Sequence, residues 1–172
     1  MRRVSLALPA LLLLAGCGYH LVGTASTLPP DLKKLHVEVF KNSTGWADVD
    51  QRLSESLTAE WVRRRRYVLV DDPKDADIVL KGRILSVRST PVTVDSHGRA
   101  TEYQMTLTVS AELDDVRGKK PKRLWQDKGF SRRTSYPVDI DAVDYFDRQT
   151  QAIEDVSREL ARDLVTAILE GF

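Results

Sequence analysis

Cysteine and histidine are scarce in this chain of 172 residues, which has one cysteine and three histidines. A single cysteine excludes an internal disulfide and a zinc site built from thiolates alone. The histidines stand far apart, at His20, His36 and His97, so a metal cluster is not predicted. Lys and Arg number 26 against 25 Asp and Glu, a balance that does not indicate a nucleic-acid-binding protein. We therefore expect no metal, no other cofactor and no nucleic-acid partner.

Motifs of common catalytic and nucleotide-binding sites are also missing. The nine glycines include no GxGxxG and no GxxxxGK[ST] loop that would cradle phosphates. The acidic stretch 71–77 lacks the glycine and glutamate spacing of an EF-hand. No Ser-His-Asp or Cys-His set is apparent, so no catalytic residue is predicted and the chain is not expected to be an enzyme. An envelope hydrolase that uses His36 or His97 is retained as an alternative hypothesis.

The apolar run at the N-terminus is too short for a membrane span. Arg2 and Arg3 precede an apolar run over 6–15, and ten helical residues rise only about 15 Å, half of a bilayer core. A cleaved signal peptide over 1–16 is therefore favoured. The run ends in Leu14-Ala15-Gly16-Cys17, which resembles the bacterial lipobox, whose cysteine becomes lipidated and N-terminal. We expect lipid attachment at Cys17; the alternative is an ordinary secretory signal followed by a chance cysteine.

Cleavage before Cys17 defines three segments. Residues 1–16 form the signal peptide, residues 17–32 a lipidated N-terminus with a polar, proline-rich tether, and residues 33–172 a single α/β domain. The basic residues lose Arg2 and Arg3, so 24 remain against 25 acidic residues. No second apolar run is long enough to span a bilayer. The mature protein is expected to be near neutral and anchored to a membrane through lipid.

Apolar periodicity predicts an α+β fold. Apolar and polar residues alternate over 102–114, as in an antiparallel strand with one buried face. Val49, Leu53, Leu57 and Trp61 recur every four residues and form one helical stripe. The predicted elements, in chain order, are a strand at 35–40, a helix at 47–65, a short strand at 67–70, long strands at 77–93, 102–114 and 123–136, and a helix at 141–170. We expect a two-layer sandwich in which two helices cover one face of a mixed, mainly antiparallel sheet of about four to five strands.

Several finer features follow from these elements. In the strand at 35–40, Leu35, Val37 and Val39 are expected on the apolar face and His36 on the solvent side or at an edge. Gly82 interrupts a long strand, which suggests a bulge or a close backbone approach. Gly98 is the expected left-handed residue of the hairpin loop, and residues 114–122 are expected to form a polar loop.

Basic side chains gather in three clusters, at 63–66, 119–123 and 132–133. Each is interpreted either as a solvated face or as a site for an anionic glycolipid, because Arg pairs phosphate in bidentate fashion and Lys supplies a point charge. Arg88 and Arg99 flank the hairpin and could add to such a surface. The sequence does not indicate whether these clusters converge.

A resemblance extends over the whole chain. It is carried by Cys17-Gly18-Tyr19-His20-Leu21, the segment 28–32, the hairpin 95–105, Trp125 with 130–137, and the end 169–172. In this order the segments resemble the LptE family of LPS-assembly lipoproteins. The resemblance implies a small α/β lipoprotein on the inner leaflet of the outer membrane. It would plug the LPS-assembly β-barrel protein one to one, help that barrel assemble, and help insert lipopolysaccharide into the outer leaflet.

The same resemblance implies a sorting signal and lipid contacts. Gly18, and not an aspartate, directly follows the cysteine. By the sorting of bacterial lipoproteins, this resembles a signal for transport to the outer membrane. Family members contact lipopolysaccharide through basic residues near the hairpin, whereas this chain has Ser96 where a basic residue is expected and acidic residues at 139–147. The candidate contacts are Arg88, His97, Arg99, Arg64 and Arg65. The alternative function is a lipoprotein adaptor or scaffold of another envelope assembly machine.

Overall fold

The alternating residues in the middle of the chain form strand β5 (Ala100–Asp115). Met105, Leu107 and Val109 are fully buried, whereas Thr106 and Thr108 between them are partly exposed. Successive side chains of a strand point to opposite faces, so β5 has one face in the core and one facing outward. The computed structural model describes residues 28–138 and 145–171, and β5 is the middle strand of a three-stranded meander within it.

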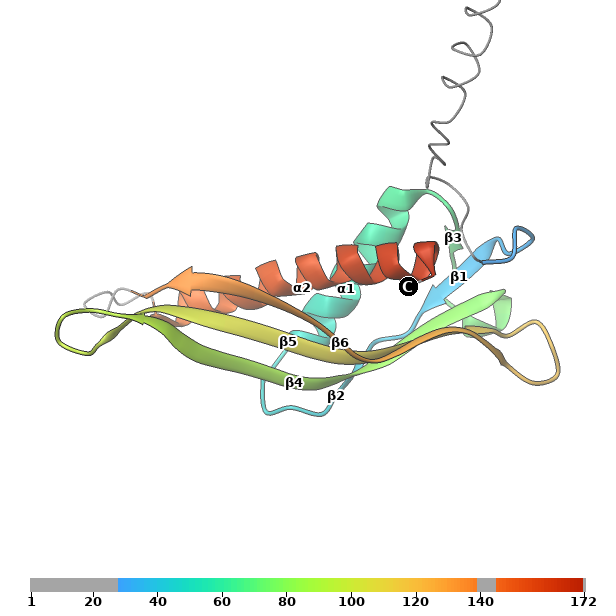
Figure 1. Cartoon of the computed structure of the whole chain (residues 1–172). Coiled ribbons are helices and arrows are strands. Elements are labelled where there is room, and N and C mark those ends of the chain that lie inside the picture. Colours follow the sequence, from blue (N-terminus) through green and yellow to red (C-terminus); the bar gives the residue numbers. More distant parts are fainter. Residues whose placement is uncertain (1–27, 139–144, 172) are drawn as a thin grey trace, which may run out of the picture.

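The sheet combines this long meander with a short parallel part. Strands β4 (Ile78–Val94) and β6 (Lys122–Pro137) flank β5 and run antiparallel to it, which gives the sheet its elongated shape (Figure 1). Strand β1 (Lys34–Val37) lies parallel between β4 and the edge strand β3 (Val68–Leu69). The order is β3-β1-β4-β5-β6, and β2 (Lys41–Asn42) also pairs with β4.

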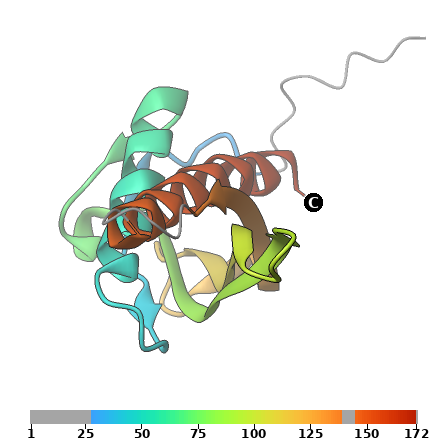
Figure 2. The same ribbon diagram turned by 90° about the vertical axis from the view of Figure 1, so that its left-hand side faces the viewer.

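Both helices cover the same face of this sheet (Figure 2). Helix α1 (Val49–Arg64) contacts the β1 and β3 side, and helix α2 (Tyr145–Glu170) contacts β5 and β6. A single 3-10 turn, η2 (Pro73–Asp75), precedes β4. Over residues 28–138 and 145–171, no helix has the length and apolar character to cross a membrane. The predicted α+β sandwich, with two helices on one face of a mixed sheet, is confirmed.

The first strand differs from its prediction. β1 ends at Val37, and Val39, which was expected on the apolar face, is 66% exposed. Glu38 still donates its backbone N–H to the Leu80 carbonyl at 2.9 Å, and the chain then departs from β4 so that Phe40 enters the core, where its backbone N–H donates to Ser54 Oγ at 3.1 Å. Burying a phenylalanine ring stabilises the fold more than continuing a two-residue run of strand. His36, expected on the solvent side or at an edge, is half-buried, with Nδ1 2.9 Å from the Val70 carbonyl oxygen.

Other boundaries shift by a few residues. Helix α1 starts at Val49 rather than at residue 47, after Asp48 in the left-handed region at φ 57°. Only two residues of the strand expected at 67–70 pair, and Tyr67 packs instead against Trp61 with ring centroids 5.6 Å apart. The final helix is described from Tyr145, and the predicted start at residue 141 falls outside the described residues.

Gly82 provides a close approach between backbone and core, which confirms that prediction. A Cβ atom built at this position would lie 2.3 Å from Phe40 Cε2 and 2.5 Å from the carbonyl oxygen of Ser110. Both separations are far inside van der Waals contact. Gly82 therefore permits the Phe40 ring to lie against β4.

Ser157 lies on α2 and its side chain is fully buried. Its hydroxyl has no hydrogen-bond partner among the described residues. A buried, unpaired polar group costs about 1–3 kcal/mol. The variant Ser157→Ala removes that group and leaves nearly the same volume. We expect it to stabilise the domain by about 1 kcal/mol, raising Tm by about 2–4 °C, measured by thermal unfolding.

Ser54 provides the matched control for this prediction. Its hydroxyl is also buried, but it donates to the Asp50 carbonyl at 2.7 Å and accepts from Phe40 N–H. Ser54→Ala should therefore destabilise the domain by about 1–2 kcal/mol. A fall in Tm for Ser157→Ala would contradict the prediction.

Candidate functional site

The five predicted lipopolysaccharide contacts lie in three separate places. His97 and Arg99 belong to the β4–β5 hairpin at one end of the long sheet (Figure 1). Arg88 lies further back along β4. Arg64 and Arg65 lie at the C-terminal end of α1, which leads into β3 near the other end. The fold does not bring these residues together into one site.

Asp95 organises the hairpin loop and neutralises part of it. Its Oδ1 accepts the backbone N–H groups of His97 at 2.8 Å and Arg99 at 2.9 Å, and its Oδ2 accepts from Arg99 Nε at 2.9 Å. The backbone N–H of Arg99 is the main cause that lowers the pKa of the Asp95 carboxyl below its ordinary value. Gly98 has φ 77°, as predicted for this turn. The positive charge of Arg99 is therefore largely balanced by the Asp95 carboxylate.

The guanidinium of Arg64 is held within the fold. Glu60 is 7% exposed, and its Oε1 accepts from Arg64 Nε at 2.7 Å while Oε2 accepts from Arg63 Nε at 2.9 Å. Arg64 also donates to Thr166 Oγ1 on α2 at 2.6 Å. Arg64 thus connects the two helices. Arg65, the C-cap residue, is exposed and leaves its guanidinium available.

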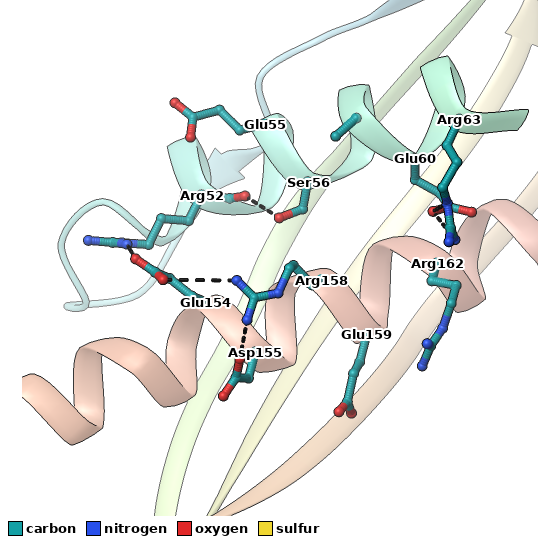
Figure 3. Close-up of a pocket in the computed structure, with 11 residues that line it drawn as sticks. Arg52, Glu55, Ser56, Glu60, Arg63, Glu154, Asp155, Arg158, Glu159 and Arg162 are labelled. Atoms are coloured by element: carbon teal, nitrogen blue, oxygen red, sulfur yellow. Dashed lines mark hydrogen bonds and ion pairs between the residues drawn. The ribbon is translucent and has the colours of Figure 1, made fainter. Parts of the chain in front are cut away.

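A groove of about 630 Å³ runs between α1 and α2 (Figure 3). Charged side chains of both helices line it, and many are paired: Arg52 bonds Glu154 across the groove, and Arg158 bonds Asp155. The hydroxyl of Ser56, inside the groove, donates to the Arg52 carbonyl at 2.8 Å (Figure 3). The groove therefore offers a mixed-charge surface, with arginine and carboxylate side chains from both helices.

Four charged residues form an ion-pair network on the outward face of the sheet. Lys81 Nζ lies 3.0 Å from Asp114 Oδ2 and 3.5 Å from Glu112 Oε1, and Arg123 bonds both carboxylates. Asp114 is only 3% exposed. The prediction of a polar loop from residue 114 is wrong here, because Asp114 and Asp115 complete β5. The signal was present: Asp114 continues the polar positions of the alternation that includes Glu112.

Opposing effects act on the Asp114 carboxyl. Burial raises its pKa, but hydrogen bonds from Arg123 and Lys81 outweigh burial, so the pKa lies below its ordinary value. A carboxyl whose pKa is lower in the folded state contributes stability above its unfolded pKa, and that stability disappears as pH falls through the folded pKa. The network therefore stabilises the domain at neutral pH and weakens in acid.

The variant Asp114→Asn should lose this contribution. Breaking a buried pair costs about 3–5 kcal/mol, and because Lys81 and Arg123 are partly exposed we expect about 2 kcal/mol at pH 7. Urea unfolding at pH 7 and at lower pH would measure it, and the gap from wild type should narrow below about pH 4. Asp71→Asn, at an exposed turn position, is the control and should change stability by less than about 0.5 kcal/mol. If the stability difference between Asp114→Asn and wild type did not change with pH, the ion pairs of Asp114 would not be its cause.

The last residues of the predicted tether are fixed to one end of the sheet. Leu28 and Leu32 are buried, and Arg117 in the β5–β6 turn donates to Asp31 Oδ2 at 2.5 Å. Asp77 Oδ2 accepts the backbone N–H groups of Lys33 at 2.8 Å and Lys34 at 2.9 Å, which lower the pKa of its carboxyl. The chain thus enters the domain opposite the β4–β5 hairpin.

No group of three or more His, Cys, Asp or Glu side chains is arranged to hold a metal ion in the part of the chain that the structure describes. The features assembled above are ion pairs, a charged groove and an open sheet face. They define a two-layer α+β domain that carries charged side chains on both its helix side and its sheet side. The same fold occurs in the hypothetical protein CT253 of Chlamydia trachomatis: the TM-score is 0.58 at 13% identity, covering 82% of this chain and 97% of that one.

Sequence comparisons identify the family. A family model described as LptE, lipopolysaccharide-assembly, matches residues 32–168. The chain is 31% identical over 159 residues to the LPS-assembly lipoprotein LptE of Photorhabdus laumondii, covering 91% of this chain and 81% of that protein. It is 35% identical over 106 residues to the protein of the same name from Pectobacterium atrosepticum, covering 60% and 52%. The chain belongs to the LptE family of lipopolysaccharide-assembly proteins, which confirms the resemblance.

Proposed function

We propose that this protein is an outer-membrane lipoprotein that plugs the LPS-assembly β-barrel protein. It is anchored on the periplasmic side by acyl chains on Cys17 and meets its barrel one to one. It helps the barrel assemble and supports the transport of lipopolysaccharide and its insertion into the outer leaflet. The observation that carries the proposal is the match of the lipopolysaccharide-assembly family model to residues 32–168.

The surface of the domain supports a place inside a barrel. The lumen of a transmembrane barrel is polar, so a plug needs polar side chains and little net charge. The helix side has ion pairs such as Arg52–Glu154, and the sheet side has the Lys81–Asp114 pair and its neighbours. With 24 basic and 25 acidic residues after position 16, the chain has almost no net charge. Such a surface can pair with lumen side chains of either sign.

Direct contact with lipopolysaccharide remains a prediction. Among the candidates, Arg64 and Arg99 already bond Glu60 and Asp95, so their guanidinium groups are less available to a lipid phosphate. Arg65, Arg88 and His97 are exposed. The plug role does not depend on lipid contact at any of these positions.

A pull-down tests the proposal directly. The tagged, lipidated protein would be recovered from its own envelope in gentle detergent and the eluate identified by mass spectrometry. We expect a β-barrel of the LPS-assembly type in about equal amount, and we expect depletion of the protein to lower surface lipopolysaccharide. Recovery of a different machine, with unchanged surface lipopolysaccharide, would favour the adaptor alternative instead.

A further inference from the structure

The outward face of the sheet carries a row of residues that we call the arginine row: Arg88 on β4, Thr106 on β5 and Arg133 on β6. The register pairs Arg88 with Thr106 and Thr106 with Arg133. Thr106 lies between the buried residues Met105 and Leu107, so it points away from the core. Paired residues of neighbouring strands share a face, and the two arginines therefore flank Thr106 on the side of the sheet opposite α1 and α2.

The two arginines of this row lack a counter-charge. Among the described residues, neither Arg88 nor Arg133 has an ion pair or a hydrogen bond, and both are exposed. Arg132, the neighbour of Arg133, provides the contrast: it points to the helix side and bonds Asp163 of α2. Of these two consecutive arginines on β6, Arg132 on the helix side is neutralised by Asp163, whereas Arg133 on the outward face has no ion pair among the described residues.

Hydroxyl groups adjoin the arginine row. A second row, which we call the hydroxyl row, lies two residues along each strand from the first and on the same face. It consists of Ser86 on β4, Thr108 on β5 and Ser131 on β6, which the register pairs with one another. None of the three hydroxyls has a hydrogen-bond partner in the described ranges. Each can donate and accept one or more hydrogen bonds. Two exposed arginines beside these three hydroxyls form a surface that can bond carboxylates and polar side chains.

We propose that the arginine row and the hydroxyl row form the surface by which the protein seats against the inner wall of its barrel partner, with carboxylates of that wall bonded to Arg88 and Arg133. The inference rests on the proposed function and deepens it by naming the contact face and its chemistry. Arginine bonds carboxylates in bidentate fashion and is strongly favoured at interfaces. Serine and threonine hydroxyls suit the polar side chains that line a barrel lumen.

The surroundings of the row favour a protein wall over other occupants. Small ligands bind in concave sites, and the arginine row lines neither the groove between the helices nor the smaller hollow beside Lys81 and Gly82. A second copy would bring one pair of free arginines towards another, which repel.

Charge reversal tests the contact. The variant Arg88→Glu/Arg133→Glu changes the row from attracting carboxylates to repelling them, and we expect at least a tenfold fall in co-purified barrel. The matched control Lys119→Glu/Lys120→Glu has the same change in charge at exposed positions of the β5–β6 turn and should leave co-purification unchanged. The Tm of each purified variant should stay close to wild type, because none of the four side chains is buried.

Site-specific photo-crosslinking provides an independent readout. A benzophenone amino acid at Ser131 in the hydroxyl row should crosslink to the barrel. The same probe at Lys119, exposed in the β5–β6 turn, should give a much weaker adduct. A strong adduct from Lys119 without one from Ser131 would overturn the proposal and move the contact away from the arginine row.

The outcomes separate this inference from the proposed function. Failure of the wild-type protein to recover the barrel counts against the proposed function. Recovery by wild type and by the Arg88→Glu/Arg133→Glu variant alike overturns only the contact surface. A variant that recovers the barrel but binds purified lipopolysaccharide less tightly would make the row a lipid-phosphate site, and a dimeric adduct from Ser131 would make it a contact between copies.

Discussion

Replacing Cys17 with serine is expected to abolish fatty-acid labelling of the protein and to lower the amount of it in the outer-membrane fraction, where only contact with the barrel would then hold it. A serine hydroxyl cannot accept the thioether-linked lipid that the lipobox directs to a cysteine. Each acyl methylene buried in a bilayer contributes about 0.8 kcal/mol, and several chains are needed for durable anchoring. Labelling with a radioactive fatty acid, followed by separation of the two membranes, measures both effects.

Two substitutions at Gly18 serve as controls for this prediction. Gly18→Ala leaves Cys17 and the small residues around it in place, so labelling and outer-membrane location should persist. Gly18→Asp should keep the label but move the protein to the inner membrane, since an aspartate directly after the cysteine is unfavourable for outer-membrane sorting. A Cys17→Ser protein that still takes up label would exclude Cys17 as the lipid attachment site.

The second large effect is expected from Gly82→Ala, which should destabilise the domain by about 3 kcal/mol. The new methyl group would meet both the Phe40 ring and the Ser110 carbonyl, at 2.3 Å and 2.5 Å in the present geometry. The ring could move only by leaving the core, and the carbonyl belongs to the β5 backbone. Chemical denaturation monitored by circular dichroism measures the loss.

Matched substitutions separate the two contacts. Gly45→Ala adds the same methyl group where nothing lies within 4 Å, so it should change stability by less than about 0.5 kcal/mol. In a Phe40→Leu background, Gly82→Ala should lower the free energy of unfolding by a smaller amount, because the aromatic ring is gone. Some loss of stability should persist, because the contact with the Ser110 carbonyl remains. An equal cost in both backgrounds would show that the ring does not limit this position.

Local periodicity accounts for what the sequence predicted well. The alternation that defines β5 and the stripe of Val156, Leu160 and Leu164 on α2 depend on neighbours along the chain. Val39 was misplaced because the choice between continuing a strand and burying Phe40 depends on Gly82, more than forty residues away. Sequence patterns describe faces of single elements but do not contain the contacts between distant ones.

The charged residues illustrate the same limit at the candidate site. Glu60 could have been foreseen as a partner of Arg63 and Arg64, since spacings of three and four place them on one helix face. The distinction between Arg132 and Arg133 could not, because it depends on Asp163 of a separate element. The prediction grouped basic residues by sequence proximity, whereas the availability of each guanidinium is decided by long-range packing.

The hydrogen bonds of Asp31 and Asp77, which we call the clasp, hold the chain at one end of the sheet and give the protein a defined reach. β4 has 17 residues and spans about 55 Å at 3.3 Å per residue, with its start beside the clasp and its end at the hairpin. A bilayer core is about 30 Å thick. If the lipid proposed at Cys17 holds the clasp end near one membrane surface, β4 is long enough for the hairpin end to reach the level of the opposite leaflet.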